Sequence, residues 1–303
     1  MKDITQTGIV TDEKTAVALG IFDGVHRGHR RVLSKAFSHD ELKRAVFTFN
    51  THTVDSKGRD YKMLITDSFK RRLLERAGAE YIYSPDFYTL KMMPAEEFAR
   101  DILKGALHAE VAVCGERFRF GHKAEGDSEA LIRYGRKYGF SVEIVERLDE
   151  NGTRISSSLI RQLVSEGEIE KANRLLGYSY GYCCEVIHGN EIGRTWDFPT
   201  INQQIPDGLV LPRFGVYVSN VHINDRCFTG VTNIGVKPTV EHDIKPLAET
   251  FIVGFEGDLY GKDIEIELFE FIRPERKFDS FDELKAEIKR NTEYAKQAYS
   301  KYI

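Results

Sequence analysis

The sequence predicts an α/β domain built on a parallel sheet, followed by an antiparallel β-barrel that ends in a helix. The first half of the chain alternates mostly continuous apolar runs with helix-like segments, which is typical of βαβ units and a buried parallel sheet. After about residue 180 the runs become β-rich and partly alternating, with Gly, Asn and Asp turns and few helices between them, which favours a barrel. The last segment, residues 279–303, has the pattern of one long helix.

The individual elements follow from these periods. Strands are predicted over residues 16–22, 44–49, 80–84, 109–115 and 140–148, and helices over residues 28–38, 67–77, 94–104 and 127–138. A further helix is predicted over residues 156–177, where Gly177 is a stop signal. The change of period places the domain boundary at 180/181, which gives domains over 1–180 and 181–303. The terminal helix starts with Ser280 and Glu283 at capping-box spacing.

Composition and charge exclude several classes of protein. A net charge of −4 argues against a general binder of nucleic acid or membrane surfaces, although one nucleotide can still bind in a local pocket. No apolar run is long enough to cross a bilayer, and the N-terminal segment MKDITQTGIV lacks the apolar core of a signal peptide. The four cysteines form no CxxC pair and no regular framework, so we expect reduced thiols in a cytoplasmic protein. We expect a monomer or a loose homo-oligomer.

Two histidines stand three residues apart in LGIFDGVHRGHRRVL (19–33), where an apolar strand gives way to a helix. His26 and His29 are open to three interpretations at this spacing: metal ligands, packed or solvated side chains, or phosphate donors. A metal site needs a third ligand, and no obvious cysteine or His-rich partner lies nearby in the sequence. Phosphate binding is favoured, because Gly24 and Gly28 let the backbone approach a ligand and a helix start offers free N–H groups.

A set of ordered motifs carries a resemblance to a known family. The segment GIFDGVHRGH resembles the GxFDGxHxGH signature of the HxGH nucleotidyltransferase superfamily, whose domain has a Rossmann-like parallel sheet. More narrowly, the chain from about residue 10 to 295 resembles the bacterial bifunctional riboflavin kinase/FMN adenylyltransferase (FAD synthetase) family. The further matching segments are GERFRFGHKAEGD (115–127), ISSSLIR (155–161), GRTWDFPTIN (193–202), NIGVKPT (233–239) and FEGDLYGK (255–262).

The resemblance implies that the first domain joins FMN to ATP and releases FAD and pyrophosphate. The nucleophile is then an FMN phosphate oxygen that is already ionised near neutral pH, so the site has to align anions and disperse charge. The resemblance assigns this task to His26 and His29. Further nucleotide-binding positions are Gly20, Phe22, Asp23, Gly24, Gly28, Ser156, Ser157, Ser158 and Arg161. For the serines, ordinary helix N-capping is an equally strong interpretation, and it is compatible with phosphate binding.

For the second domain the resemblance implies phosphorylation of riboflavin by ATP, which gives FMN. Here the nucleophile is an alcohol, so a general base helps, and the family's catalytic glutamate falls on Glu249. The alternative for Glu249 is a strand carboxylate that faces solvent. Thr200 and Asn202 match the family's Mg²⁺ and nucleotide-phosphate positions, and oxygen donors suit Mg²⁺. The remaining positions implied to bind nucleotide are Gly189, Gly193 and Arg194.

The chain departs from the family pattern mainly in the first domain. Arg117 stands where the family has Asp or Asn, and TFNTHT (48–53) lacks both prolines of the family's TF-x-PHP segment. These departures leave two alternatives to the bifunctional enzyme. One is a riboflavin kinase whose first domain is degenerate or transfers a different nucleotide, and the other is a non-catalytic sensor of flavin or nucleotide. Phe118, Phe120 and Tyr260 are candidates for stacking on the flavin ring, with core packing as the more common fate.

Overall fold

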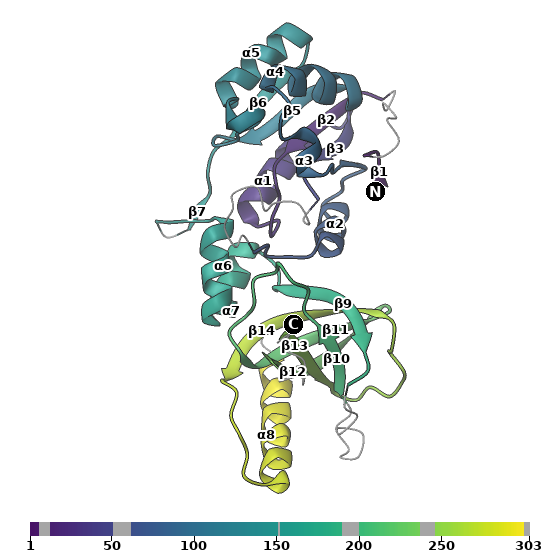
Figure 1. Cartoon of the computed structure of the whole chain (residues 1–303), viewed down its shortest axis with the longest axis vertical. Coiled ribbons are helices and arrows are strands. Elements are labelled where there is room, and N and C mark those ends of the chain that lie inside the picture. The colour runs from purple at the N-terminus through teal and green to yellow at the C-terminus, as the bar shows by residue number, and fades with distance from the viewer. Residues whose placement is uncertain (6–12, 51–61, 151, 190–199, 237–245, 300–303) are drawn as a thin grey trace. The chain divides into compact units, whose positions relative to one another are not determined.

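The computed structural model describes residues 1–5, 13–50, 62–150, 152–189, 200–236 and 246–299, and within this part it confirms the predicted fold class. The chain forms two compact units (Figure 1). The first unit holds Met1–Met63 and Asp67–Ser157, and the second holds Leu64–Thr66 and Ser158–Ile303. The segment 158–180 therefore groups with the barrel, whereas the boundary at 180/181 between two functional domains stays a prediction.

The first unit is built on a six-stranded sheet in which every neighbouring pair of strands is parallel. The strand order is β1-β4-β3-β2-β5-β6, and β2 is fully buried along its length because the sheet is covered on both faces. The sequence patterns missed β1, a two-residue strand, since so short a segment has no detectable period. The strands are β1 (Lys2–Asp3), β2 (Thr15–Leu19), β3 (Lys43–Phe47), β4 (Tyr81–Tyr83), β5 (Ala109–Gly115) and β6 (Ser141–Val145).

Helices connect these strands, as predicted. The helix predicted over 94–104 begins as the short α-helix α4 and continues directly as the π-helix η2, which makes up most of its length. Phe98 and Leu103 of η2 pack in one apolar cluster with Leu131 of α5 and with Val17 and Leu19 of β2. The helical elements are α1 (Arg27–Ala36), α2 (Asp67–Arg76), α3 (Phe87–Leu90), α4 (Ala95–Glu97), η2 (Phe98–Ala106), η3 (His122–Ala124) and α5 (Ser128–Tyr138); a short hairpin of β7 (Asp149–Glu150) and β8 (Thr153–Arg154) follows.

The single helix predicted over 156–177 is wrong, because two helices occupy this segment. Helix α6 (Ser157–Glu166) ends at Gly167, which has φ = 83°, and α7 (Ile169–Leu176) follows. The N–H of Gly167 donates to the carbonyl of Val164 at 3.1 Å, and the N–H of Glu168 donates to that of Leu163 at 2.8 Å. This pair of bonds is a Schellman cap, which stops a helix where glycine adopts a left-handed conformation. The predicted stop at Gly177 is confirmed.

The second unit is a closed antiparallel barrel with strand order β10-β13-β12-β11-β14-β9 (Figure 1). Buried Gln203 points into the barrel, where its Nε2 donates to the carbonyls of Cys184 at 2.6 Å and Ile264 at 2.8 Å. Since side chains alternate along a strand, Asn202 lies on the outer face. The strands are β9 (Gly181–Ile187), β10 (Thr200–Gln204), β11 (Gly215–Ile223), β12 (Arg226–Val236), β13 (Pro246–Ile252) and β14 (Asp263–Arg273).

The predicted terminal helix is α8 (Phe281–Tyr299), which packs Ala295 and Ala298 against Val218 of β11 and Phe269 of β14. The Oγ of Ser280 accepts the N–H of Glu283 at 3.2 Å, as its predicted capping position requires. Among the residues that the structure describes, no helix is both long enough and apolar enough to span a membrane.

Candidate functional site

The sheet order places a ligand-binding position at the carboxyl end of β2. From β2 the chain continues through β3 and β4 on one side, whereas β5 and β6 lie on the other. In open parallel sheets ligands bind beyond the carboxyl ends of the strands, at the point where the order reverses. The segment Gly20–His26 leaves β2 at this point, so the two histidines lie where the topology favours a ligand.

The turn between β2 and α1 has an unusual backbone. Phe22, Gly24 and Val25 have φ values of 52°, 80° and 34°, and a positive φ in a β-branched residue is strained. Two side chains from elsewhere in the same unit hold the turn. The hydroxyl of Thr48 donates to the Ile21 carbonyl at 2.8 Å, and the hydroxyl of Ser157 donates to the Asp23 carbonyl at 2.9 Å. Strain of this kind persists where the surrounding structure fixes it, and it clusters at functional sites.

His26 and His29 form a stacked pair at the start of α1. Their ring centroids lie 3.6 Å apart with an interplanar angle of 13°, and the Phe22 ring meets His29 edge-on at 5.4 Å. The Nδ1 of His26 caps the helix by accepting the N–H of His29 at 3.2 Å. Neutral His26 therefore carries its proton on Nε2, where it can donate to an anion. A Cβ at Gly28 would lie 3.2 Å from the His26 ring, so glycine leaves room for this ring position.

Burial keeps both imidazoles neutral. It lowers the pKa of His26 from 6.5 to about 4, and burial together with the neighbouring His26 lowers the pKa of His29 well below its usual value. The Nδ1 of His29 is buried and has no hydrogen-bond partner among the described residues. At neutral pH the pair can thus offer hydrogen bonds to phosphate without carrying a charge of its own.

Acid is expected to destabilise the first unit through His26. Below pH 6.5 the unfolded chain protonates this imidazole while the folded chain does not, so stability falls as the pH drops from 6.5 towards 4 and levels off below. The loss is about 2 kcal/mol by pH 5. We expect His26→Asn, which keeps an N-cap side chain, to remove this part of the pH dependence. Urea unfolding of both proteins at pH 7 and pH 5 measures the difference, and equal losses would contradict the prediction.

The serine motif contacts the histidine turn through Ser157. Ser157 starts α6 and holds the Asp23 carbonyl, and Ser156 precedes it in the chain. Ser158 and Arg161 continue the same helix and belong to the second compact unit. The structure thus brings Ser157 to the turn, whereas phosphate binding by Ser156, Ser157, Ser158 and Arg161 stays a prediction.

Lys70 is a candidate functional residue that the sequence motifs missed. Its side chain on α2 is fully buried, with Nζ 2.5 Å from the Phe49 carbonyl oxygen and 3.4 Å from Oδ1 of Asp67. Burial lowers the pKa of Lys70, while the carboxylates of Asp67 and Asp23 act in the opposite direction. The cation of Lys70 therefore lies within electrostatic reach of buried Asp23 of the histidine turn. The signal in the sequence was a lysine on the same helix face as Leu73 and Leu74.

Replacing Lys70 with Met is expected to destabilise the first unit by about 3–5 kcal/mol, because the buried carboxylate of Asp23 and the partly buried carboxylate of Asp67 lose this cation. Arg72→Met on the exposed side of the same helix is the matched control, for which we expect a change within about 0.5 kcal/mol. The free energy of unfolding in urea measures both. If Lys70→Met lowered the free energy of unfolding no more than the control does, the buried cation would contribute little to stability.

The barrel brings Glu249 next to two asparagines. Glu249 on β13 pairs in register with Asn202 on β10 and with Asn233 on β12. Directly opposite residues in an antiparallel pair point to the same face, with Cβ atoms about 4.5–5.5 Å apart. The three side chains thus share the outer face, while the adjacent Thr250 points inwards, where its hydroxyl lies 2.9 Å from that of Thr232. Glu249 is partly exposed, as a base that meets a substrate must be.

Asn202 offers an oxygen that suits a hard cation. Its side chain is 6% exposed, and its Oδ1 has no hydrogen-bond partner among the described residues. A Cβ at Gly189 would lie 2.4 Å from Nδ2 of Asn202, so only glycine lets the backbone pass so closely. Thr200 lies two residues away on β10 and so faces the same side. The predicted positions Gly193 and Arg194 lie outside the described residues.

Two of the three candidate stacking residues pack within the protein. Phe120 is 6% exposed and belongs to the core cluster, and Phe118 stacks on it with centroids 5.6 Å apart. The core already covers the ring of Phe120, so the prediction that Phe120 stacks on a flavin ring is wrong. Tyr260 stacks on His188 at 3.9 Å near the end of β9. Arg117, the departure from the family pattern, is exposed just beyond the carboxyl end of β5.

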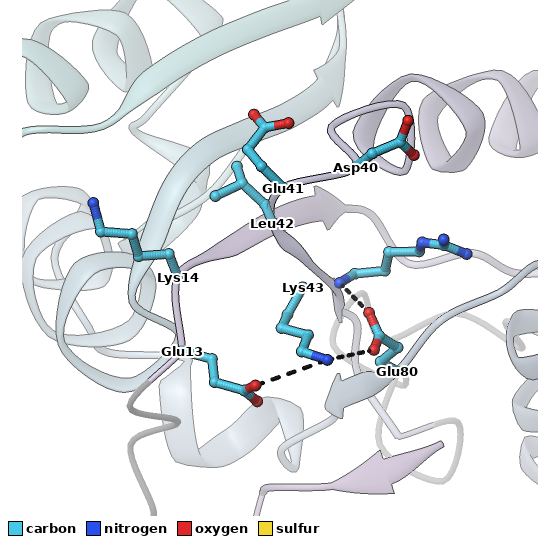
Figure 2. A pocket seen from close by; sticks show the side chains of 8 residues that line it. Glu13, Lys14, Asp40, Glu41, Leu42, Lys43 and Glu80 are labelled. Carbon is cyan, nitrogen blue, oxygen red and sulfur yellow. Dashed lines mark hydrogen bonds and ion pairs between the residues drawn. The ribbon is translucent and has the colours of Figure 1, made fainter.

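A polar pocket lies at the opposite edge of the sheet (Figure 2). It is lined around the amino ends of β2 and β3, where Lys43 is 3.0 Å from Glu80 and 3.7 Å from Glu13. The second Glu80 oxygen accepts the N–H of Arg44 at 3.0 Å. Lys43 is already paired with both carboxylates, and ligands of parallel sheets bind at the other edge. We therefore assign no catalytic role to this pocket.

Comparisons with known proteins match the two parts of the chain to two families of enzyme domains. Residues 9–159 match the family model of FAD synthetase, and residues 176–299 match that of riboflavin kinase. Proteins described as bifunctional riboflavin kinase/FMN adenylyltransferase are 34% identical in Listeria monocytogenes, over 97% of this chain and 96% of the relative, and 35% identical in Bacillus subtilis, over 95% and 93%. A crystal structure described as a macrolide-efflux protein from Streptococcus pneumoniae has a TM-score of 0.83 at 31% identity, covering 96% of this chain and 97% of that one.

Proposed function

The chain belongs to the bifunctional riboflavin kinase/FMN adenylyltransferase family, and we propose on this premise how its residues divide the two reactions of flavin cofactor biosynthesis. Residues 181–303 phosphorylate riboflavin to FMN, and residues 1–180 transfer the adenylyl group of ATP to FMN to give FAD. The observation that carries this division is the presence of two clusters in two compact units. The stacked histidines lie at the switch point of the sheet, and Glu249 lies beside Asn202 on the barrel.

Adenylyl transfer needs alignment and charge dispersal rather than a base. An oxygen of the FMN phosphate attacks the α-phosphorus of ATP, the bond to the bridging oxygen breaks, and pyrophosphate leaves with the negative charge. His26 donates from Nε2, and His29 and the free N–H groups at the start of α1 add further donors. Gly20, Gly24 and Gly28 let the phosphates approach the backbone, and Phe22 and Asp23 fix the turn.

Phosphorylation of riboflavin needs a base, which we assign to Glu249. Its carboxylate accepts the proton of the ribityl hydroxyl as the oxygen attacks the γ-phosphorus of ATP, and ADP leaves. Thr200 and Asn202 would hold Mg²⁺, which supplies charge neutralisation at the phosphates when bound. The buried Oδ1 of Asn202 supports this assignment. Gly189, whose backbone passes close to Asn202, leaves room for the phosphates here, and Gly193 and Arg194 are further proposed contacts.

We also propose the cytoplasm as the compartment, since Cys114, Cys183, Cys184 and Cys227 are free thiols. A monomer or a loose homo-oligomer stays our proposal for the assembly. ATP is the co-substrate of both reactions, and Mg²⁺ the cation.

The test is a time course of riboflavin, ATP and Mg²⁺ with the full chain, in which chromatography separates riboflavin, FMN and FAD. FMN followed by FAD is the expected result. FMN without FAD, even with added FMN and pyrophosphatase, would favour a kinase whose first domain has changed its reaction, and exposed Arg117 would then be the first residue to examine. Flavin binding without any product would favour a sensor.

A further inference from the structure

A second cluster of ligand-type side chains lies on the outer face of the barrel, away from Glu249. His222 on β11 pairs in register with Glu265 on β14, and Glu267 follows two residues along the same strand. One ligand atom from each of the three lies within 4.8 Å of the others, and Nε2 of His222 is 3.0 Å from an oxygen of Glu267. None of these residues has a part in either proposed reaction.

The burial of these carboxylates favours a shared cation. Glu265 is only 3% exposed, and the side chain of Glu267 is 16% exposed. Two carboxylates held this close repel each other, and burial strengthens the repulsion because less water screens it. A divalent cation between the carboxylates and the imidazole of His222 would offset this repulsion.

Cys227 supplies the support that a metal-binding histidine needs. It lies opposite His222 in the β11–β12 pair, and its Sγ is 3.3 Å from Nδ1 of His222. A histidine that binds a metal through Nε2 carries its proton on Nδ1 and donates it to a neighbouring group, which orients the ring. The thiol sulfur of Cys227 is placed to accept this hydrogen bond.

We propose that His222, Glu265 and Glu267 form a binding site for a divalent metal ion of the zinc type, with Cys227 as a positioning residue. Bonds of 2.0–2.1 Å to a tetrahedral zinc ion put neighbouring donor atoms about 3.3 Å apart. The separation of 3.0 Å between His222 and Glu267 is close to this value. Imidazole nitrogen and carboxylate oxygen are both zinc ligands, whereas Mg²⁺ favours oxygen ligands alone.

The site is distinct from the magnesium position proposed for the kinase reaction. Cys227 and Asn233 lie six positions apart on β12, which corresponds to roughly 20 Å along an extended strand. A metal bound at His222 would tie β11 to β14 near the turn that joins β11 and β12. We therefore expect the ion to stabilise the barrel and not to take part in phosphoryl transfer.

Titration of the full chain with Co²⁺, after treatment with a chelator and without nucleotide, tests the proposal. Co²⁺ in a tetrahedral site absorbs visible light, so the spectrum reports both binding and geometry. We expect one equivalent to bind, the same signal with Asn202→Ala, and loss of that signal with Glu267→Gln. Cys227→Ser is expected to weaken binding about 10–100-fold. Exposed Glu185→Gln on β9 is the matched control and should bind as the wild type does.

A thermal unfolding series with Zn²⁺ provides the second readout. Zn²⁺ should raise the melting temperature of the wild type and of Glu185→Gln but not that of Glu267→Gln. Glu267 is the more exposed of the two carboxylates, so its isosteric replacement is expected to leave the barrel folded. Equal Co²⁺ spectra and equal Zn²⁺ shifts in the wild type and Glu267→Gln would overturn the proposal and leave an ordinary histidine–glutamate ion pair. Loss of binding in Asn202→Ala would overturn it as well.

Discussion

Glu249→Gln is expected to stop FMN formation from riboflavin while FAD formation from supplied FMN continues. The substitution keeps the size and the outer-face position of the side chain but removes its ability to accept the hydroxyl proton. Loss of an aligned general base costs about 10²–10⁴-fold in rate. Initial rates of FMN formation, with riboflavin and ATP saturating, measure the effect on kcat.

Two comparisons separate a chemical role of Glu249 from a structural one. Glu185→Gln, an exposed carboxylate on β9 of the same barrel, should leave both rates unchanged. A pH profile is the second comparison, because a base imposes an acidic limb on the kinase rate that the Gln variant lacks. If Glu249→Gln removed both activities from a folded chain, the assignment of the two reactions to separate sites would be wrong.

The reverse pattern is expected for His29→Ala, with FAD formation lost and FMN formation retained. The stacked ring of His29 lies against Phe22 and His26 at the start of α1, where phosphates are expected to bind. Removing one preorganised donor to a developing anion typically costs about 10²–10³-fold in kcat. The rate of FAD formation from FMN and ATP measures the loss, and the kinase rate of the same preparation serves as the internal standard.

His39→Asn is the matched control for this variant. His39 lies beyond the carboxyl end of α1, where its Nε2 is 3.1 Å from Glu143, so it is a helix length away from the proposed site. We expect its replacement to leave FAD formation unchanged. Retention of FAD formation in His29→Ala would show that helix N-terminal groups and His26 suffice, and the catalytic assignment of His29 would then fail.

Together these variants also test the departures from the family pattern. Arg117 is exposed beyond β5, and Asn50 ends the described part of the segment that lacks the family's prolines. If the wild type forms FAD and His29→Ala does not, then these departures are tolerated. If neither forms FAD, the first domain has lost or changed its reaction, and Glu249→Gln still decides the kinase assignment by itself.

The sequence alone determined the local features of this protein. Continuous apolar runs predicted β2, β3 and β5 within a few residues, because a strand that is buried on both faces of a parallel sheet has apolar residues at nearly every position. The position of His26 and His29 at a strand-to-helix junction followed from the glycines and the helical pattern around them. The ordered motifs led to the family, which the comparisons support.

Only the tertiary structure decided which distant residues share a site. The register that sets Asn202 and Asn233 beside Glu249 depends on pairing between strands that are far apart in the sequence, and no local period encodes it. The same reason applies to Lys70, whose position in the sequence is that of an ordinary helix lysine, whereas packing buries it within electrostatic reach of Asp23. Local patterns report burial and secondary structure, whereas the chemistry of a site depends on contacts that form only when separate elements pack together.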